Sequence, residues 1–260
     1  PGADDRRAMI RLLFLASLEL SGGVLGPAAQ PLPAATAQIP TTSLAPRLKR
    51  AMSLSLEDLR QLQAEVAQGK PSPSKSYQEA YLNYLLVGNL KKLDPKAAKD
   101  LLKRTLKELE PQKDPESLAL QGGCVGHKIG FNPLLAPMLS AKATGLFAQA
   151  LKGAPGSPRV RWFQAVHTRG MPGFLGGGAK AARPLLEAAL GAAETEAETE
   201  DPLAPRWGKT EILIWLATTQ ADTGDVPLAV ATVRRALALA PEHPLALSVE
   251  AQLLQMEKPR

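Results

Sequence analysis

The chain has 260 residues, of which 45% are hydrophobic and 4% aromatic, and its formal net charge is +6. This length and hydrophobic content exclude a disordered chain and allow one or two domains with a sizeable core. Alanine and leucine dominate the apolar residues, which favours helix packing over a β-sandwich. We interpret the basic excess as a solubility effect rather than nucleic-acid binding, because stacking aromatics do not alternate with the basic residues.

The N-terminal residues resemble a secretory signal peptide. Met9 is interpreted as the start, with Arg11 as a positive residue before an apolar run at 12–20. Small residues at 27–29 and 35–37 offer cleavage sites, and this is the order of elements in a signal peptide. We therefore expect export to the periplasm, with a disordered tail on a cytoplasmic protein as the alternative.

The expected organisation has three parts. Upstream residues and a signal peptide occupy 1–37, a disordered linker occupies 38–54, and one helical repeat domain occupies 55–258. After the N-terminal run, no segment is expected to reach the roughly 18 apolar residues that cross a membrane, so no integral membrane segment is predicted. The single cysteine, Cys124, excludes an intramolecular disulfide.

Helices are predicted from the start of the repeat domain. Ser55 opens the first one within an S-x-x-D capping signal, and Gly69 ends it. A second helix spans about 76–90, and the Asp-Pro pair at Asp94 starts its partner, because Asp caps helix N-termini and Pro suits the first helical position. Apolar residues recur at helical spacing in both, so 79–110 is predicted to be a helix hairpin.

Two irregular hairpins follow. One starts at the Asp-Pro pair at Asp114; the glycines at 122–130 are expected to loosen its first helix, and the stretch 131–137 to interrupt it. The next starts at the Ser-Pro pair at Ser157 and has a long loop at 171–178 where a tight turn would be expected. Both second helices keep an apolar stripe.

The clearest hairpin is 210–241. Small and apolar residues recur around its Gly224-Asp225 turn: Leu213, Leu216, Ala217, Ala229, Val233, Ala236 and Leu237. This pattern is typical of a tetratricopeptide-like unit. An acidic tract at 194–201 is expected to be a solvated loop or a frayed helix end before it. A lone helix at 244–256 is expected to cover the last unit. The predicted fold is all-α, a solenoid of tetratricopeptide-like helix hairpins with irregular loops between helices.

Three strings carry a resemblance to a known group. They are FNPLL at 131–135, GSPRV at 156–160 and FLGGGAKA at 174–181. The chain resembles, over residues 77–243, a family of exported bacterial tetratricopeptide repeat proteins of unknown activity. The resemblance implies a right-handed α-solenoid and a location outside the cytoplasm, and it supplies no catalytic residues.

No catalytic or metal site is predicted. The glycines at 176–178 precede a helix, but no Ser or Thr follows Lys180, so a structural turn is favoured over an anion cradle. Cys124 and His127 are three residues apart, yet no orienting third group or oxyanion site accompanies them. The three histidines lack metal-ligand spacing, and no cofactor is expected.

The predicted function is a non-enzymatic scaffold that binds a protein or peptide partner. First helices line the inner face of such a solenoid, so a partner is expected to contact Asn83, Val87, Trp162, Phe163, Val166, Ile214 and Thr218. Core packing is the competing interpretation for Trp162.

The alternative is a small-molecule or lipid-binding protein. Its pocket would lie between repeats and be closed by the loops 129–139 and 171–178, with Phe131, Leu134, Met138, Met171, Phe174 and Leu175 as lining residues. An enzyme is the remaining alternative, and it would need titratable side chains that converge in one cleft.

Overall fold

The computed structural model describes residues 44–197 and 199–257, and these residues contain helices and no strand. The predicted signal peptide at 1–37 and the first part of the predicted linker lie outside the described residues. Within the described ranges eleven α-helices follow one another: α2 (Leu44–Lys49), α3 (Leu56–Ala67), α4 (Pro73–Leu93), α5 (Pro95–Leu109), α6 (Pro115–Phe131), α7 (Ala136–Gly153), α8 (Pro158–Gly170), α9 (Ala179–Glu194), α10 (Lys209–Asp222), α11 (Val226–Leu239) and α12 (Pro244–Glu257). Three short 3₁₀ helices join them: η1 (Ala51–Ser53), η2 (Pro133–Leu135) and η3 (Gly173–Leu175).

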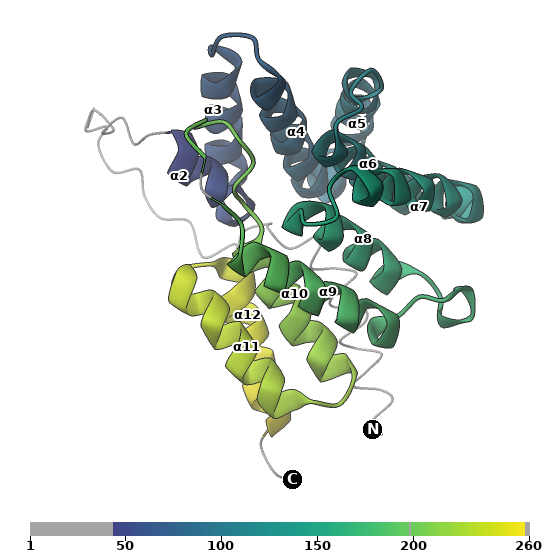
Figure 1. The fold of residues 1–260 in the computed structure, drawn as a ribbon, viewed down its shortest axis with the longest axis vertical. Coiled ribbons are helices and arrows are strands. Elements are labelled where there is room, and N and C mark those ends of the chain that lie inside the picture. The colour runs from purple at the N-terminus through teal and green to yellow at the C-terminus, as the bar shows by residue number, and fades with distance from the viewer. Residues whose placement is uncertain (1–43, 198, 258–260) are drawn as a thin grey trace.

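The helices form a stack of hairpins, which confirms the predicted all-α, solenoid-like fold (Figure 1). Helices α4–α5, α6–α7, α8–α9 and α10–α11 pair with each other, and each hairpin packs against the next. The first helices α4, α6, α8 and α10 lie on one side of the stack, which we call the inner face. Helix α3 packs on α4 at one end, and the lone helix α12 covers α10 and α11 at the other, as predicted.

The start of the domain differs from the prediction. Residues 44–54 were expected to be disordered, yet they form α2 and η1, and Leu48 and Ala51 are buried. The side chain of Arg47 donates a hydrogen bond to Glu65 of α3. The apolar residues of this short segment therefore belong to the core of the helical domain.

Four helix starts share one chemistry. A Ser or Asp before a first-position proline accepts a hydrogen bond from the backbone N–H three residues on, which satisfies one of the free donors of the first turn. The capping residues are Ser72, Asp94, Asp114 and Ser157. The starts at Asp94, Asp114 and Ser157 were predicted, whereas α4 begins three residues earlier than expected.

The glycines of α6 do not loosen it. Helix α6 is continuous, and a Cβ added at Gly122 would lie 2.4 Å from the ring of Phe147, while one at Gly123 would lie 2.5 Å from the ring of Phe163. Each glycine thus lets an aromatic ring of a neighbouring helix approach the α6 backbone. The prediction of a loosened helix was wrong because close packing needs glycine there.

Helix α7 carries an unusually apolar sequence. Residues 133–153 have the length and composition of a membrane span, since an 18-residue stretch within them has a mean hydropathy of 1.2, and 28% of that stretch is buried. This corrects the expectation that no later segment reaches such a composition. The buried side of α7, formed by Leu139, Ala143, Phe147 and Ala150, packs within the stack.

Candidate functional site

The residues predicted to line the inner face do not form an open groove. Six of the seven are buried, namely Asn83, Val87, Trp162, Phe163, Ile214 and Thr218, and Val166 is partly buried. Asn83 accepts a hydrogen bond from Gln63 of α3. Helix α10, which carries Ile214 and Thr218, is packed among α8, α9, α11 and α12. The predicted partner-binding groove is therefore closed in this structure.

The described residues between α9 and α10, 195–197 and 199–208, account for much of this closure, and we call them the crossing segment. This segment leaves α9 and runs to the start of α4 before returning to α10, and it is the green loop near α2 and α3 in Figure 1. The side chain of Gln78 on α4 donates a 2.8 Å hydrogen bond to the carbonyl of Leu203. Ser74 donates to the carboxylate of Asp201. The segment thus joins hairpins that are not neighbours in the stack.

Trp207 is the anchor of the crossing segment. Its ring is 2% exposed and stacks on Tyr81 of α4, with ring centroids 4.4 Å apart and planes inclined by 5°. The rings of Trp162 and Phe163 on α8 meet it edge-on, at 5.3 and 5.7 Å. Offset-stacked and edge-on pairs are the favourable aromatic geometries, so Trp207 fills the inner face between α4 and α8.

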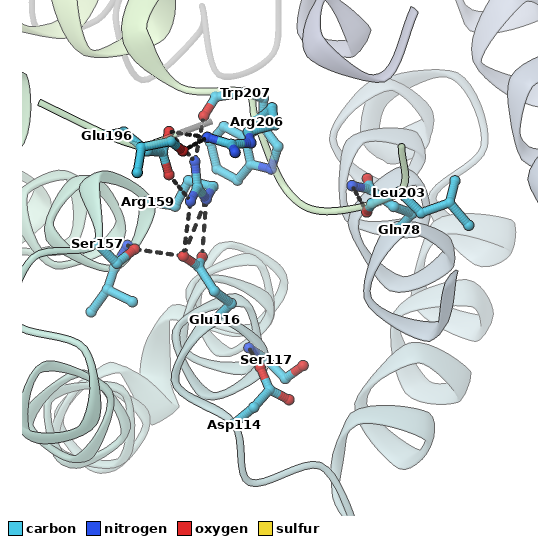
Figure 2. Close-up of polar contacts among 12 residues, drawn as sticks. Gln78, Asp114, Glu116, Ser117, Ser157, Arg159, Glu196, Leu203, Arg206 and Trp207 are labelled. Carbon is cyan, nitrogen blue, oxygen red and sulfur yellow. Dashed lines mark hydrogen bonds and ion pairs between the residues drawn. The ribbon is translucent and has the colours of Figure 1, made fainter. Parts of the chain in front are cut away.

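Arg159 holds the crossing segment by charge (Figure 2). Its Nε lies 3.2 Å from both carboxylate oxygens of Glu116 on α6, and its Nη1 donates at 3.2 Å to Glu196 and to the carbonyl of Trp207. Ser157 donates a 2.6 Å hydrogen bond to Glu116. Burial alone would lower the pKa of Arg159, but the two carboxylates outweigh it and raise the pKa above its usual value.

Sequence reasoning found neither of these anchors. Arg159 entered the sequence analysis only within the string GSPRV at 156–160, and no role was predicted for Trp207. The informative signal was the composition of the segment itself, since a tryptophan in a loop between two apolar helices needs a hydrophobic site. The prediction of a solvated loop at 194–201 was incomplete, because Glu196 is paired with a buried arginine.

A second region carries the exposed apolar side chains. Seven of the nine exposed large hydrophobic residues in the described part lie at or just after the turn within a hairpin: Leu93, Leu134, Leu135, Met138, Phe174, Leu175 and Leu228. We call this set the loop edge. The largest exposures are 92% for Leu134 and 87% for Phe174, followed by Leu93 at 66% and Met138 at 63%. Single exposed apolar residues are ordinary, but a cluster of them marks an interaction surface.

Contacts between hairpins place these turns along one side of the stack. The ring of Phe131 at the end of α6 lies beneath the ammonium groups of Lys91 and Lys99, at 5.7 and 5.6 Å, near the α4–α5 turn. His167 near the end of α8 lies 3.1 Å from Ser140 near the start of α7. Arg183 near the start of α9 contacts Asp225 at the α10–α11 turn. In Figure 1 the loop after α8 projects to the right of the stack.

The six residues predicted to line a loop pocket divide into two groups. Leu134, Met138, Phe174 and Leu175 belong to the loop edge and face solvent, whereas Phe131 and Met171 are partly buried. The two loops therefore present apolar side chains but do not close a cavity over them. A separate depression of about 330 Å³ lies between α3, α4 and α5, and Gln63, Glu79, Asn83 and Glu108 contribute to its lining.

The glycine-rich loop is a structural turn. The backbone N–H groups of Gly176, Gly177 and Gly178 donate to Gly173, Pro172 and Thr168, at 3.0, 3.1 and 2.9 Å. Gly176 and Gly178 have φ angles of 80° and 92°, which side chains rarely allow. Because all three N–H groups donate to carbonyls of the loop or of α8, they do not offer an anion cradle.

Titratable groups are scattered rather than gathered. Burial raises the pKa of the Cys124 thiol to about 12, so the thiol is protonated at neutral pH. Burial, together with the nearby Lys91, lowers the pKa of His127 to about 4. Burial raises the pKa of Glu211 to about 7, beside the crossing segment. Among residues 44–197 and 199–257 no group of three or more His, Cys, Asp or Glu side chains is placed to hold a metal ion.

Comparison with known proteins identifies a similar fold but no family. No protein family and no curated protein sequence matches the chain. Among solved structures, the HusA haemophore from Porphyromonas gingivalis is similar, with a TM-score of 0.52 and 22% sequence identity. The similarity covers 72% of this chain and 97% of the haemophore. The all-helical architecture is therefore shared with a solved protein, while membership of a tetratricopeptide family is not confirmed.

Proposed function

We propose that this protein is a non-enzymatic binding protein whose binding surface is the loop edge, and that its ligand is an apolar small molecule. The observation that carries the proposal is the concentration of exposed apolar side chains at the turns, led by Leu134 and Phe174. The inner face offers no comparable surface, since Trp207 and its neighbours fill it.

The fold similarity supports a ligand class. The similar structure is described as a haemophore, so a planar tetrapyrrole is the first ligand to test. The loop edge suits such a molecule, because apolar side chains can cover its ring while exposed lysines such as Lys128 and Lys180 attract its carboxylates. His167, whose Nε2 lies 3.1 Å from the Ser140 hydroxyl near the start of α7, and the exposed Met138 are candidate iron ligands on this side.

The test is a titration of the purified chain with haem and, separately, with metal-free protoporphyrin, followed by their absorption bands. A saturable spectral change is expected with haem. The double variant L134S/F174S should weaken binding at least about tenfold, because each buried Leu or Phe contributes roughly 1.5–3 kcal/mol. The matched control is Leu239→Ser, another exposed apolar residue that lies at the end of α11 away from the turns.

The comparison of the two porphyrins separates the sources of affinity. Equal binding of both porphyrins would assign the affinity to apolar contact. Tighter binding of haem would assign the additional affinity to iron ligation by His167 or Met138. Saturable binding that Leu134→Ser and Phe174→Ser leave unchanged would overturn the placement at the loop edge. If neither porphyrin binds, tetrapyrroles are excluded as the ligand class.

A peptide-binding scaffold that uses the inner face is the second candidate. The crossing segment lies there as a bound peptide would, held by an aromatic stack, by carbonyl hydrogen bonds and by the Arg159 pair. The Tyr81 hydroxyl and the Trp162 ring nitrogen are buried without a hydrogen-bond partner among the described residues, which costs about 1–3 kcal/mol each. A labelled peptide of residues 195–208 that binds the Trp207→Ala variant, and not the wild type, would favour this candidate.

Export and repeat-family membership form the remaining part of the proposal. The signal-like N-terminus and the tetratricopeptide-like hairpin at 210–241 support an exported repeat protein. The mass of the protein recovered from the envelope fraction tests export, since cleavage after residue 29 or 37 removes the signal. Recovery of the uncleaved chain from the cytoplasm would contradict it.

A further inference from the structure

The loop edge combines exposed apolar tips with an unusual charge distribution. Residues 117–186 contain no Asp or Glu. This stretch runs from the first turn of α6 to the middle of α9. The same stretch contains eight basic residues: Lys128, Lys142, Lys152, Arg159, Arg161, Arg169, Lys180 and Arg183. Both loops with the most exposed apolar residues lie within it.

Most of the arginines of this stretch are already matched by acidic residues from other segments. Arg159 pairs with Glu116 and Glu196, as described above. Arg169 lies 2.5 Å from Asp222, and Arg183 lies 3.0 Å from Glu187 and 3.4 Å from Asp225. The acidic groups at the α10–α11 turn are therefore held by arginines and do not offset the charge of the exposed lysines.

Three lysines remain exposed around the apolar tips. Lys128 lies in the last turn of α6, Lys142 in the second turn of α7 and Lys180 at the start of α9. Lys96 is also exposed, at the start of α5, where Asp94 and Asp100 are the nearby acidic residues in the sequence. An apolar tip surrounded by lysine ammonium groups is the chemistry that recognises an anionic lipid surface.

Helix α7 adds a third observation. It starts at the loop edge, its sequence is apolar enough for a membrane span, and only 28% of that stretch is buried. Its exposed positions include Pro137, Ala141, Gly145 and Ala148, which offer little to bind water. These positions of the helix can therefore lie close to a bilayer without the cost of desolvating charged groups.

We infer that the loop edge docks the protein on an anionic lipid bilayer. Phe174, Leu175, Leu134 and Met138 enter the interfacial region, and Lys128, Lys142 and Lys180 contact the phosphates of the headgroups. The inference deepens the proposed function and rests on the same edge, because it names the surface at which an apolar ligand would be collected or delivered. Its test needs no ligand, so the two fail independently.

The experiment measures co-sedimentation of the ligand-free protein with vesicles. Pure phosphatidylcholine vesicles are compared with phosphatidylcholine vesicles that contain phosphatidylglycerol. Binding is expected only to the anionic vesicles, and it should fall when salt rises from about 0.15 M to about 1 M, because the screening length shortens from about 8 Å to about 3 Å. Binding to both vesicle types alike, or to neither, would overturn the inference.

Variants assign the binding to the loop edge. K128E/K180E should lower the partition coefficient more than about tenfold, since each lysine near an anionic surface is equivalent to about fivefold. L134S/F174S should lower it by at least about tenfold. The matched controls are Lys152→Glu and Leu239→Ser, which lie at the opposite ends of their helices, and neither should change it. Equal losses in the controls would contradict the assignment.

A probe at the edge reports insertion directly. Cys124 is buried, so an environment-sensitive dye should label a Leu175→Cys variant at the new cysteine alone. Its emission is expected to shift to the blue with anionic vesicles. Concentration-dependent self-association in sedimentation, with a blue shift in the absence of lipid, would instead assign the edge to a second copy of the chain and overturn the inference.

Discussion

The inner face and the loop edge contain similar residues in opposite situations. Trp162 and Phe163 on the inner face are buried beneath Trp207, whereas Phe174 and Leu134 on the loop edge face solvent. Much of the difference arises from the crossing segment, which covers the inner face around Trp162 and leaves the turns uncovered. A residue's place in the helix repeat therefore indicates which side of the stack it occupies, but not whether that side is accessible.

This contrast separates stability from binding. The inner face is rigidly specified by stacked rings and by a buried arginine with two carboxylates. Substitutions there should change the free energy of unfolding. The loop edge has few neighbours to lose, so substitutions there should change binding and leave stability nearly unchanged.

The largest expected effect belongs to Trp207. Trp207→Ala removes a 2% exposed ring from between α4 and α8, and such truncations cost about 3–5 kcal/mol. Urea unfolding followed by circular dichroism at helical wavelengths measures the change. A loss of less than about 1 kcal/mol would mean that the crossing segment is not part of the core, and the contrast between the two regions would disappear.

The helices were largely predictable from the sequence, and the closure of the inner face was not. The Asp-Pro and Ser-Pro starts at Asp94, Asp114 and Ser157 are local signals, and the structure confirms each one. The path of residues 195–208 depends on contacts such as Gln78 with Leu203, which are 125 residues apart. No local pattern encodes a contact of that kind.

The candidate site was predicted in part for the same reason. The predicted repeat pattern placed Leu134, Met138, Phe174 and Leu175 in irregular loops, and all four are exposed in the structure. Register also placed Trp162 and Ile214 on first helices, which is correct, but their accessibility depended on the crossing segment and on α12. The glycines at 122 and 123 gave a packing signal that was mistaken for flexibility, because the partner rings lie on other helices.

Arg159 should give the next largest effect. Arg159→Ala leaves Glu116 and Glu196 without their shared cation, and removing one partner of a buried pair costs about 3–5 kcal/mol. Both carboxylates are partly exposed, at 19% and 24%, so we expect the lower end of this range. Arg161→Ala, two residues away and bonded to the carbonyl of Pro155, is the matched control and should cost less than about 1 kcal/mol.

The pH dependence of stability distinguishes two buried groups, one beside the crossing segment and one in α6. The pKa of Glu211 is raised to about 7 in the folded protein, so the folded state binds the extra proton and stability falls as pH rises from about 4.5 to about 7. The pKa of His127 is lowered to about 4, so the unfolded state binds the extra proton and stability rises from about pH 4 to about 6.5. The two contributions oppose each other in the wild type.

Single variants should reveal each contribution. In Glu211→Gln, the rise from His127 remains, and the free energy of unfolding should increase by about 2 kcal/mol between pH 4 and 6.5. In His127→Gln, the fall from Glu211 remains, with a similar magnitude and the opposite sign. Urea titrations at a series of pH values measure both slopes. Slopes that match the wild type in both variants would contradict the burial of these groups.

The smallest expected effect on stability is at the loop edge. It tests most directly whether the loop edge, unlike the inner face, contributes to binding rather than to stability. L134S/F174S replaces two side chains that are 92% and 87% exposed, so the free energy of unfolding should change by less than about 0.5 kcal/mol. The same protein sample should lose the porphyrin or vesicle binding tested above. A loss of stability comparable to that of Trp207→Ala would mean that the loops pack against the rest of the chain in solution. Because serine keeps the turn geometry and removes only apolar surface, unchanged stability with lost binding would assign these side chains to a ligand rather than to the fold.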